Sequence, residues 1–323
     1  MAPSPGDYRP PPWLPGGHLQ TIWPLLCKGP RPPLQRERWS TPDGDFIDLD
    51  WLPHTPGAPL VVLFHGLEGS SDSPYARSLL RHLDSLGWNG VVPHFRGCSG
   101  EPNRLPRAYH AGDADELDWI LERLAARHPD VPRFATGVSL GGNALLVWLG
   151  TRGSAAGRHL QAAAAICAPL DLAAMGHHLG RGVNRLYTRH FLATLKARAL
   201  AKLRQHPGLF DPAAVRRARN LHAFDDLVTA PLHGFRGSDD YWRRASSKPL
   251  LPAITVPTLV LNPRNDPFLP AGHLPGAADV APAICLEQPA QGGHVGFVSG
   301  PWPGQLDWLP RRLVRFFTEA GKG

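Results

Sequence analysis

Three side chains that lie far apart in the chain are of the types that carry out nucleophilic catalysis together. Ser139 is the central residue of a G-x-S-x-G pattern at residues 137–141, and Asp266 and His294 follow it in that order. A serine hydroxyl is too weakly acidic to attack an ester unaided, so it needs a histidine base, whose imidazole a carboxylate must orient. The pattern alone is weak support because glycine is common here, with 34 in 323 residues. The surrounding elements must therefore decide whether Ser139 is a nucleophile.

From residue 60 onward, short apolar runs alternate with helical stretches. The runs read as strands, and segments 73–87 and 112–128 between the first three of them read as helices because of their proline and acidic starts and their breaking ends. This rhythm predicts an α/β fold with a mostly parallel sheet covered by helices on both faces. The apolar runs are PLVVLFHG, GVVPHFRG, RFATGVS, QAAAAICAP, VPTLVLNP and PAICLEQ.

The order of these strands brings the three candidate residues to one place. Ser139 ends a strand-like run just before a predicted helix, where a tight turn between small residues would expose its hydroxyl. Asp266 follows a later strand by a few residues, and His294 follows the next strand. We predict that these three residues form a catalytic triad. The oxyanion of an acyl-transfer reaction needs two backbone N–H donors, for which we predict Leu140 and Leu67, the latter in the glycine-containing loop after VVLF.

The alternation of predicted strands and helices stops for about eighty residues after Pro169. Residues 186–203 have apolar positions at helical spacing, and Asp211-Pro212 is typical of a helix start. Residues 171–250 also hold 14 Lys/Arg against 6 Asp/Glu, whereas the net charge of the whole chain is only +7. We predict that residues 171–250 are a helical, basic cap inserted into a core of residues 35–170 and 251–323. The acids Asp171, Asp225, Asp239 and Asp240, in or beside this insertion, are weaker candidates for the triad carboxylate.

The segment before the core is rich in proline. Eight prolines lie between residues 10 and 33, so we predict that residues 1–34 form an extended arm without regular helix, fastened to the core by residues such as His18, Gln20 and Thr21. Two alternating runs on either side of Pro42-Asp43-Gly44 predict a β-hairpin. The chain closes with a predicted amphipathic helix over residues 305–319.

Composition favours an ordinary globular enzyme or binding protein. The four cysteines are scattered and the histidines lack metal-ligand spacing, so we expect reduced thiols, no metal site and no cofactor. The first residues lack the order of a signal peptide and no apolar run is long enough to span a membrane, so we expect a cytoplasmic protein. The sequence pI of 9.6 raises the possibility of nucleic-acid binding, but no base-stacking motif supports it and we expect no nucleic-acid partner.

Several longer stretches also resemble one known family. The chain is similar to the YheT-like branch of the α/β-hydrolase superfamily, which implies the α/β-hydrolase fold and the same triad of Ser139, Asp266 and His294. The resemblance implies hydrolysis of short- to medium-chain acyl esters or of lipid-derived esters, with a helical cap over the pocket. The stretches that carry it are GHLQTIWP (17–24), FHGLEGSSDSPYARSL (64–79), FRGCSGEPNRLPRAYHAGD (95–113), TGVSLGGN (136–143), FDDLVTAPLHGF (224–235), DYWRRASS (240–247), NPRNDPFLP (262–270) and GGHVGF (292–297).

These observations together predict a serine hydrolase that cleaves carboxylic esters through an acyl-enzyme, with a small acyl ester as substrate. A thioesterase or an alcohol acyltransferase with the same triad is an open alternative, because the sequence does not separate water from alcohol as the second nucleophile. The basic cap suggests a second hypothesis, that its arginines attract anionic groups such as a lipid surface. Solvated arginines on a helix face are the alternative to it, and the oligomeric state stays open.

Overall fold

One sheet organises the fold in the computed structural model, which describes residues 8–321. Within these residues eight strands pair in the order β1-β2-β4-β3-β5-β6-β7-β8. β1 and β2 form the predicted antiparallel hairpin, β2 joins β4 antiparallel, and the other pairs are parallel. The strands are β1 (Gln35–Ser40), β2 (Phe46–Trp51), β3 (Leu60–Phe64), β4 (Asn89–Pro93), β5 (Arg133–Val138), β6 (Ala162–Ile166), β7 (Thr258–Leu261) and β8 (Ile284–Glu287).

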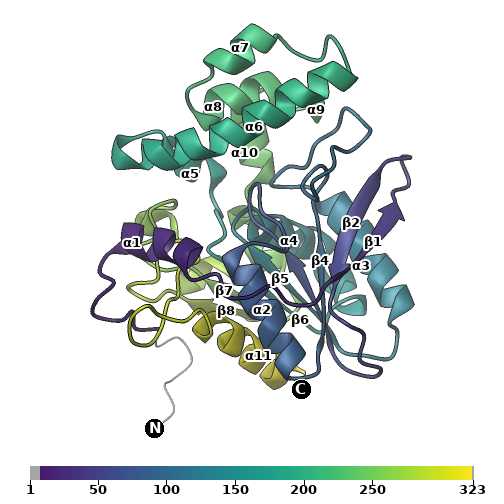
Figure 1. Cartoon of the computed structure of the whole chain (residues 1–323), viewed down its shortest axis with the longest axis vertical. Coiled ribbons are helices and arrows are strands. Elements are labelled where there is room, and N and C mark those ends of the chain that lie inside the picture. Colours follow the sequence, from purple (N-terminus) through teal and green to yellow (C-terminus); the bar gives the residue numbers. More distant parts are fainter. Residues whose placement is uncertain (1–7, 322–323) are drawn as a thin grey trace.

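Helices cover both faces of this sheet, as the strand rhythm predicted. α2 (Pro74–Ser85) and α11 (Trp308–Ala320) pack together on one face, and α3 (Ala114–Arg127) and α4 (Leu140–Arg152) pack together on the other. Figure 1 shows α2 and α11 in front of the strands. The central strands β3, β5 and β6 are buried throughout, because side chains on both faces of a parallel sheet must pack under helices. The mostly parallel α/β fold is thus confirmed.

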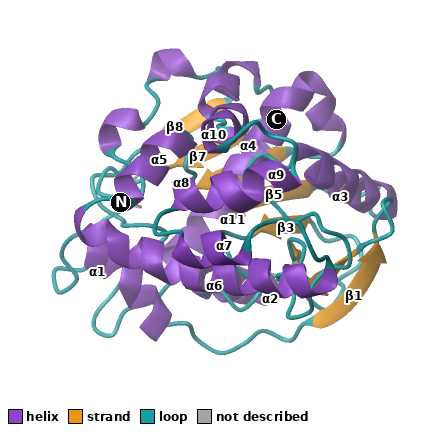
Figure 2. Cartoon of the chain, turned by 90° about the horizontal axis from the view of Figure 1, so that it is seen from above, coloured by secondary structure: helices purple, strands orange, loops and turns teal. Residues whose placement is uncertain are grey.

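The residues between β6 and β7 form a separate group of helices. Figure 1 shows them stacked above the ends of the strands, and Figure 2 shows them from above, over the sheet. We call residues 171–250 the insertion; its assignment as a cap, and the division of the chain into arm, core and cap, stay predictions. The helices are α5 (Leu172–Leu179), α6 (Arg185–Gln205), α7 (Pro212–Arg217), α8 (Leu221–Phe224), the π-helical turn η4 (Asp225–Thr229), α9 (Ala230–Leu232) and α10 (Ser238–Ala245).

The N-terminal segment contains a helix, contrary to the expectation of a fully extended arm. α1 (Gly17–Ile22) is followed by a 3₁₀ turn, η1 (Trp23–Leu26). The prediction was wrong here because the prolines gather at residues 10–15 and 30–33, which leaves GHLQTI free of proline. Only Pro24 falls inside these turns, and it sits near the start of η1, where its missing N–H costs no hydrogen bond. Residues 1–7 of the predicted arm lie outside the described residues.

The last helix begins later than expected. We predicted a helix from residue 305, whereas α11 begins at Trp308. Gln305 instead exchanges backbone hydrogen bonds with Ser299 in an isolated β-bridge, which holds it out of the helix. Across the described residues, no helix has the length and apolar character needed to span a membrane.

Candidate active site

Ser139 occupies a strained turn between β5 and α4. Its backbone φ is 52°, a conformation that costs a non-glycine residue about 1–3 kcal/mol. The turn is possible because glycines flank it. A Cβ atom on Gly137 would lie 2.3 Å from the Gly141 oxygen, and one on Gly141 would lie 2.4 Å from the Phe64 oxygen. The G-x-S-x-G pattern therefore reflects a backbone that crosses itself closely at the end of β5, with the serine hydroxyl turned outward.

The structure brings Ser139, His294 and Asp266 together into one hydrogen-bonded chain. The Oγ atom of Ser139 lies 3.0 Å from Nε2 of His294, and Nδ1 of His294 lies 2.8 Å from Oδ2 of Asp266. Because the carboxylate accepts a hydrogen bond at Nδ1, Nε2 is left free to accept the serine proton. The imidazole and carboxylate are nearly enclosed, with 10% and 2% of their side-chain surfaces exposed. This is the geometry that activates a serine for attack on a carbonyl.

Contacts that the sequence did not suggest also hold the imidazole. The ring of Phe268 stacks on the His294 ring with 3.9 Å between centroids and 21° between planes. The backbone N–H of His294 donates to Oγ1 of Thr21, which lies in α1. The sequence shows an apolar residue, Phe268, two positions after Asp266. It does not show that this ring stacks on His294.

Gln20 of α1 links the two loops that carry Asp266 and His294. Its side chain is fully buried, and its Oε1 atom accepts hydrogen bonds from Nδ2 of Asn265 and from the N–H of Gly292. Its Nε2 atom donates to the carbonyl of Leu14 and to Gln291. Asn265 and Gly292 are close neighbours of the acid and the base in the sequence. The arm therefore fixes the relative position of these two loops, whereas the sequence predicted only that Gln20 helps to fasten the arm to the core.

The backbone N–H groups of Leu67 and Leu140 lie in the two segments that flank Ser139. Leu140 is the first residue of α4, so its N–H has no acceptor within the helix. Among the described residues, the N–H of Leu67 has no acceptor either, while the preceding N–H, of Gly66, donates to Tyr75 Oη at 2.8 Å. The Gly66 backbone also lies close to Ser139, because a Cβ on Gly66 would come within 3.3 Å of the Ser139 Cβ.

An ion pair ties the Leu67 loop to the insertion. Glu68 has a positive φ of 56°, and its carboxylate lies 2.7 Å from Nε of Arg198 in α6. Tyr109 closes the arrangement, because its hydroxyl accepts from the Glu68 N–H and donates to Oε1 of Glu68. Arg198 also donates to the Gly97 carbonyl. The loop that carries Leu67 is therefore set partly by a helix of the insertion.

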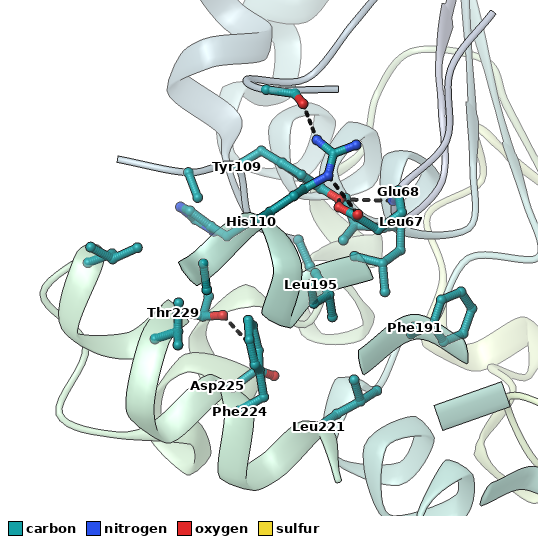
Figure 3. A pocket seen from close by; sticks show the side chains of 18 of the residues that line it. Leu67, Glu68, Tyr109, His110, Phe191, Leu195, Leu221, Phe224, Asp225 and Thr229 are labelled. Atoms are coloured by element: carbon teal, nitrogen blue, oxygen red, sulfur yellow. Dashed lines mark hydrogen bonds and ion pairs between the residues drawn. The ribbon is translucent and has the colours of Figure 1, made fainter. Parts of the chain in front are cut away.

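A cavity of about 370 Å³ lies between the sheet and the insertion, with Ser139 in its wall. Figure 3 shows side chains from the Leu67 loop and from the helices of the insertion pointing into it. The volume falls near the lower end of the range for small-molecule sites, and most of the lining is apolar. The apolar lining includes Leu67, Met175, Phe191, Leu195, Leu221 and Phe224.

The cavity lining also contains a carboxyl group, that of Asp225, which takes no part in the hydrogen bonds among Ser139, His294 and Asp266. Asp225 lies in the π-helical turn η4, where it accepts from Thr229 Oγ1 at 2.6 Å and from Trp242 Nε1 at 2.8 Å. Burial raises the pKa of Asp225 to about 6, against the opposing effect of these two hydrogen bonds. Figure 3 shows Asp225 beside Phe224 with its bond to Thr229.

The other acids considered for the triad lie elsewhere. Asp171 approaches His273, Asp239 pairs with His222, and Asp240 pairs with arginines of its own segment. Cys98 is buried, and burial raises its pKa to about 12, so this thiol is not activated as a nucleophile.

One cluster has the residue types to bind a metal. Sγ of Cys167 and the polar side-chain atoms of Asp266 and His294 lie within 4.8 Å of one another. Burial and the nearby Asp266 carboxylate raise the pKa of the Cys167 thiol, whereas a metal ligand must be a thiolate. The sulfur instead accepts from the N–H of Val295. Because His294 already bridges Asp266 and Ser139, the donor set fits a hydrogen-bonded serine site better than a metal site.

Comparisons with known proteins agree with this architecture. A family model described as "alpha/beta hydrolase fold" matches residues 59–301. The Escherichia coli (strain K12) protein named "Putative esterase YheT" is 39% identical over 307 residues, covering 93% of this chain and 90% of that protein. The Mus musculus protein named "Phospholipase ABHD3" is 31% identical over 323 residues, covering 96% of this chain and 77% of that protein.

Solved structures with low sequence identity share the fold. The mouse α/β-hydrolase domain-containing protein 10 superposes with a TM-score of 0.54 at 14% identity, covering 88% of this chain and 99% of that chain. The family match spans most of the sheet and the insertion, and the YheT match spans nearly the whole chain. The chain therefore belongs to the α/β-hydrolase family, in the branch that includes the YheT protein.

Proposed function

We propose that this protein is a serine hydrolase that cleaves carboxylic esters through an acyl-enzyme intermediate. The observation that carries the proposal is the hydrogen-bonded chain from Ser139 through His294 to Asp266 at the wall of an apolar cavity. An apolar cavity favours an acyl chain, and the hydroxyl beside it is the group an acyl carbonyl would meet. The names of the relatives, an esterase and a phospholipase, support the same class of substrate.

The reaction would proceed in two halves. Oγ of Ser139 attacks the ester carbonyl while Nε2 of His294 takes its proton, and the N–H groups of Leu67 and Leu140 bind the oxyanion. Collapse of the tetrahedral intermediate breaks the bond to the alcohol, which leaves with the proton from His294. Water then attacks the acyl-enzyme and gives one proton to His294, which returns it to Oγ of Ser139 as the bond to the acid breaks. Asp266 holds the imidazole in the tautomer that both halves need.

The cavity volume supports a medium-length acyl chain as the preferred substrate. The lining from α6 and α8 would surround the chain, so the insertion would act as the cap that sets chain-length preference. Each methylene of the acyl chain that this cavity buries would contribute about 0.8 kcal/mol to binding.

The test is hydrolysis of a series of p-nitrophenyl esters from acetate to palmitate. We expect a maximum of kcat/KM at intermediate chain length for the wild type, and loss of roughly 10⁴-fold or more of kcat for Ser139→Ala. Ser246→Ala is the matched control, because this serine lies outside the hydrogen-bonded chain and bonds within the insertion. If Ser139→Ala were as active as the wild type, the proposed function would be refuted.

A further inference from the structure

Exposed apolar side chains gather on one part of the surface. Eight large hydrophobic residues are exposed within the described part of the chain, and only Leu86 lies apart, at the end of α2. Leu26 and Trp302 expose 72% and 71% of their surfaces, values that would be costly without a partner. We call the other seven the apolar rim: Leu19, Ile22, Leu25 and Leu26 from α1 and η1, Val183 just before α6, Leu186 in its first turn, and Trp302.

Contacts between neighbouring residues join the three segments of the apolar rim. His18 of α1 stacks on Tyr187 of α6 with 5.8 Å between ring centroids, which joins α1 to the first turn of α6. At the other end, Nε1 of Trp23 donates to the carbonyl of Pro303, the residue after Trp302. Figure 1 shows α1 on the same side of the molecule as the start of α6, below it. The rim is therefore one surface, although its segments are far apart in the sequence.

The apolar rim lies next to the candidate active site. Tyr187, which follows Leu186, packs edge-on against Phe268 with 4.9 Å between ring centroids. Phe268 in turn stacks on His294. On the arm side, Thr21 lies between Leu19 and Ile22 and accepts the backbone N–H of His294. Two aromatic side chains in contact, Tyr187 and Phe268, thus connect the exposed surface to the imidazole of His294.

Four cations without acidic partners lie in or beside the segments that carry the apolar rim. Arg181 is exposed shortly before α6, Arg185 and Arg189 are exposed in its first five residues, and Lys28 is exposed after η1. None of the four forms an ion pair within the described residues, and residues 172–210 contain no Asp or Glu at all. A helix start disfavours positive charge because of its dipole, so the dipole of α6 does not favour Arg185 at its first position. Exposed apolar groups beside unpaired cations are complementary to the headgroup layer of an anionic lipid surface.

We propose that the apolar rim and its cations dock the protein on an anionic lipid surface, which brings that surface close to His294 and Ser139. Delivery of an ester to Ser139 from that surface rests on the proposed function, whereas the docking itself does not. A second copy of the chain fits less well, because a symmetric contact would set these cations against the same cations of the other copy. The proposal narrows the hypothesis of a basic cap at a lipid surface to one defined face, which includes the arm.

The first test measures binding to sedimented vesicles of phosphatidylcholine with and without about 30 mol % phosphatidylglycerol. We expect binding only to the anionic vesicles, weakened by added salt. Arg181→Gln with Arg185→Gln should weaken it about 25-fold, because each cation near an anionic leaflet contributes roughly fivefold. The matched control is Arg216→Gln with Arg219→Gln, which removes the same charge from exposed positions in and after α7, shown at the top of Figure 1. The control should bind like the wild type.

The apolar contribution is tested in the same assay by Leu26→Ser against Leu86→Ser. Both leucines are exposed, at 72% and 45%, so neither substitution disturbs the core. We expect roughly tenfold weaker binding for Leu26→Ser and no change for Leu86→Ser. Equal losses for rim and control variants would overturn the proposal, because they would indicate an effect of overall charge or hydrophobicity. Rim variants that change the oligomeric state in solution, with no wild-type vesicle binding, would assign the surface to a second copy instead.

Activity separates this proposal from the proposed function. Ser139→Ala should bind vesicles like the wild type, and the rim variants should hydrolyse a soluble p-nitrophenyl butyrate like the wild type. Hydrolysis of the soluble ester without vesicle binding would refute docking alone. Vesicle binding without any ester hydrolysis would refute the proposed function alone.

Discussion

Replacing Gln20 by methionine should impair catalysis from a position that never meets the substrate. Methionine keeps the length of the side chain but removes both hydrogen-bonding atoms. The change leaves Asn265 Nδ2 and the Gly292 N–H without their acceptor, next to the acid and the base. A buried group that loses its partner costs about 1–3 kcal/mol, so we expect a loss of about 3 kcal/mol of stability after relaxation. At an unfolding entropy of about 2.1 cal/mol/K per residue, a loss of that size in a chain this long corresponds to a fall in Tm of roughly 4 °C.

The catalytic effect is separable from the loss of stability. A shift of about 1 Å between catalytic groups costs up to about 10²-fold in rate, so kcat should fall 10- to 100-fold well below the Tm of the variant, with KM changed less than threefold. Gln288→Met is the matched control, because this glutamine donates a single hydrogen bond, to the Pro275 carbonyl, and bonds neither Asn265 nor Gly292. The assay is steady-state hydrolysis of a p-nitrophenyl ester with the folded fraction measured by circular dichroism. A folded Gln20→Met protein with wild-type kcat would refute the positioning role.

Three further outcomes follow from the same geometry. Gly141→Ala should abolish activity and lower soluble yield, because its Cβ would lie 2.4 Å from the rigid Phe64 carbonyl; normal yield and activity would disprove the required close approach. Asp225→Asn should have a higher Tm than the wild type at pH 8 but not at pH 4. Burial raises the pKa of Asp225 in the folded protein to about 6, so the wild type loses stability as the pH rises from the unfolded pKa through 6. An equal shift in Tm at both pH values would contradict this. Arg198→Met should lower kcat/KM roughly tenfold by releasing Glu68 beside Leu67, with partial retention in Arg198→Lys, and unchanged kinetics would separate the ion pair from the oxyanion loop.

The sequence predicted the parts of the fold that local patterns encode. Buried strands separated by capped helices have a distinct rhythm, so the parallel sheet and the hairpin were predictable, and strand order then brought Ser139, Asp266 and His294 to one edge. Their predicted proximity is found, whereas their catalytic role stays a proposal. The Gly137 and Gly141 pair was readable for the same reason, since a tight strand-to-helix turn requires it.

Contacts between distant segments were not predictable in this way. The bonds of Gln20 to Asn265 and Gly292 span more than 240 residues, and nothing in GHLQTI or NPRND alone indicates the partner. The helix α1 itself was missed because proline content averaged over the arm concealed a proline-free stretch. Asp225 was set aside as a triad candidate on its place in the chain, but its burial against the cavity depends on how the helices of the insertion pack, which the sequence did not specify.

Covalent labelling shows whether Ser139 is the nucleophile. The protein is treated with a fluorophosphonate that transfers its phosphonyl group to activated serines, and the modified peptide is identified by mass spectrometry. We expect a single adduct on Ser139 that requires His294, so that His294→Ala is labelled far more slowly than the wild type. An adduct on another serine, or equally fast labelling of folded His294→Ala, would contradict it.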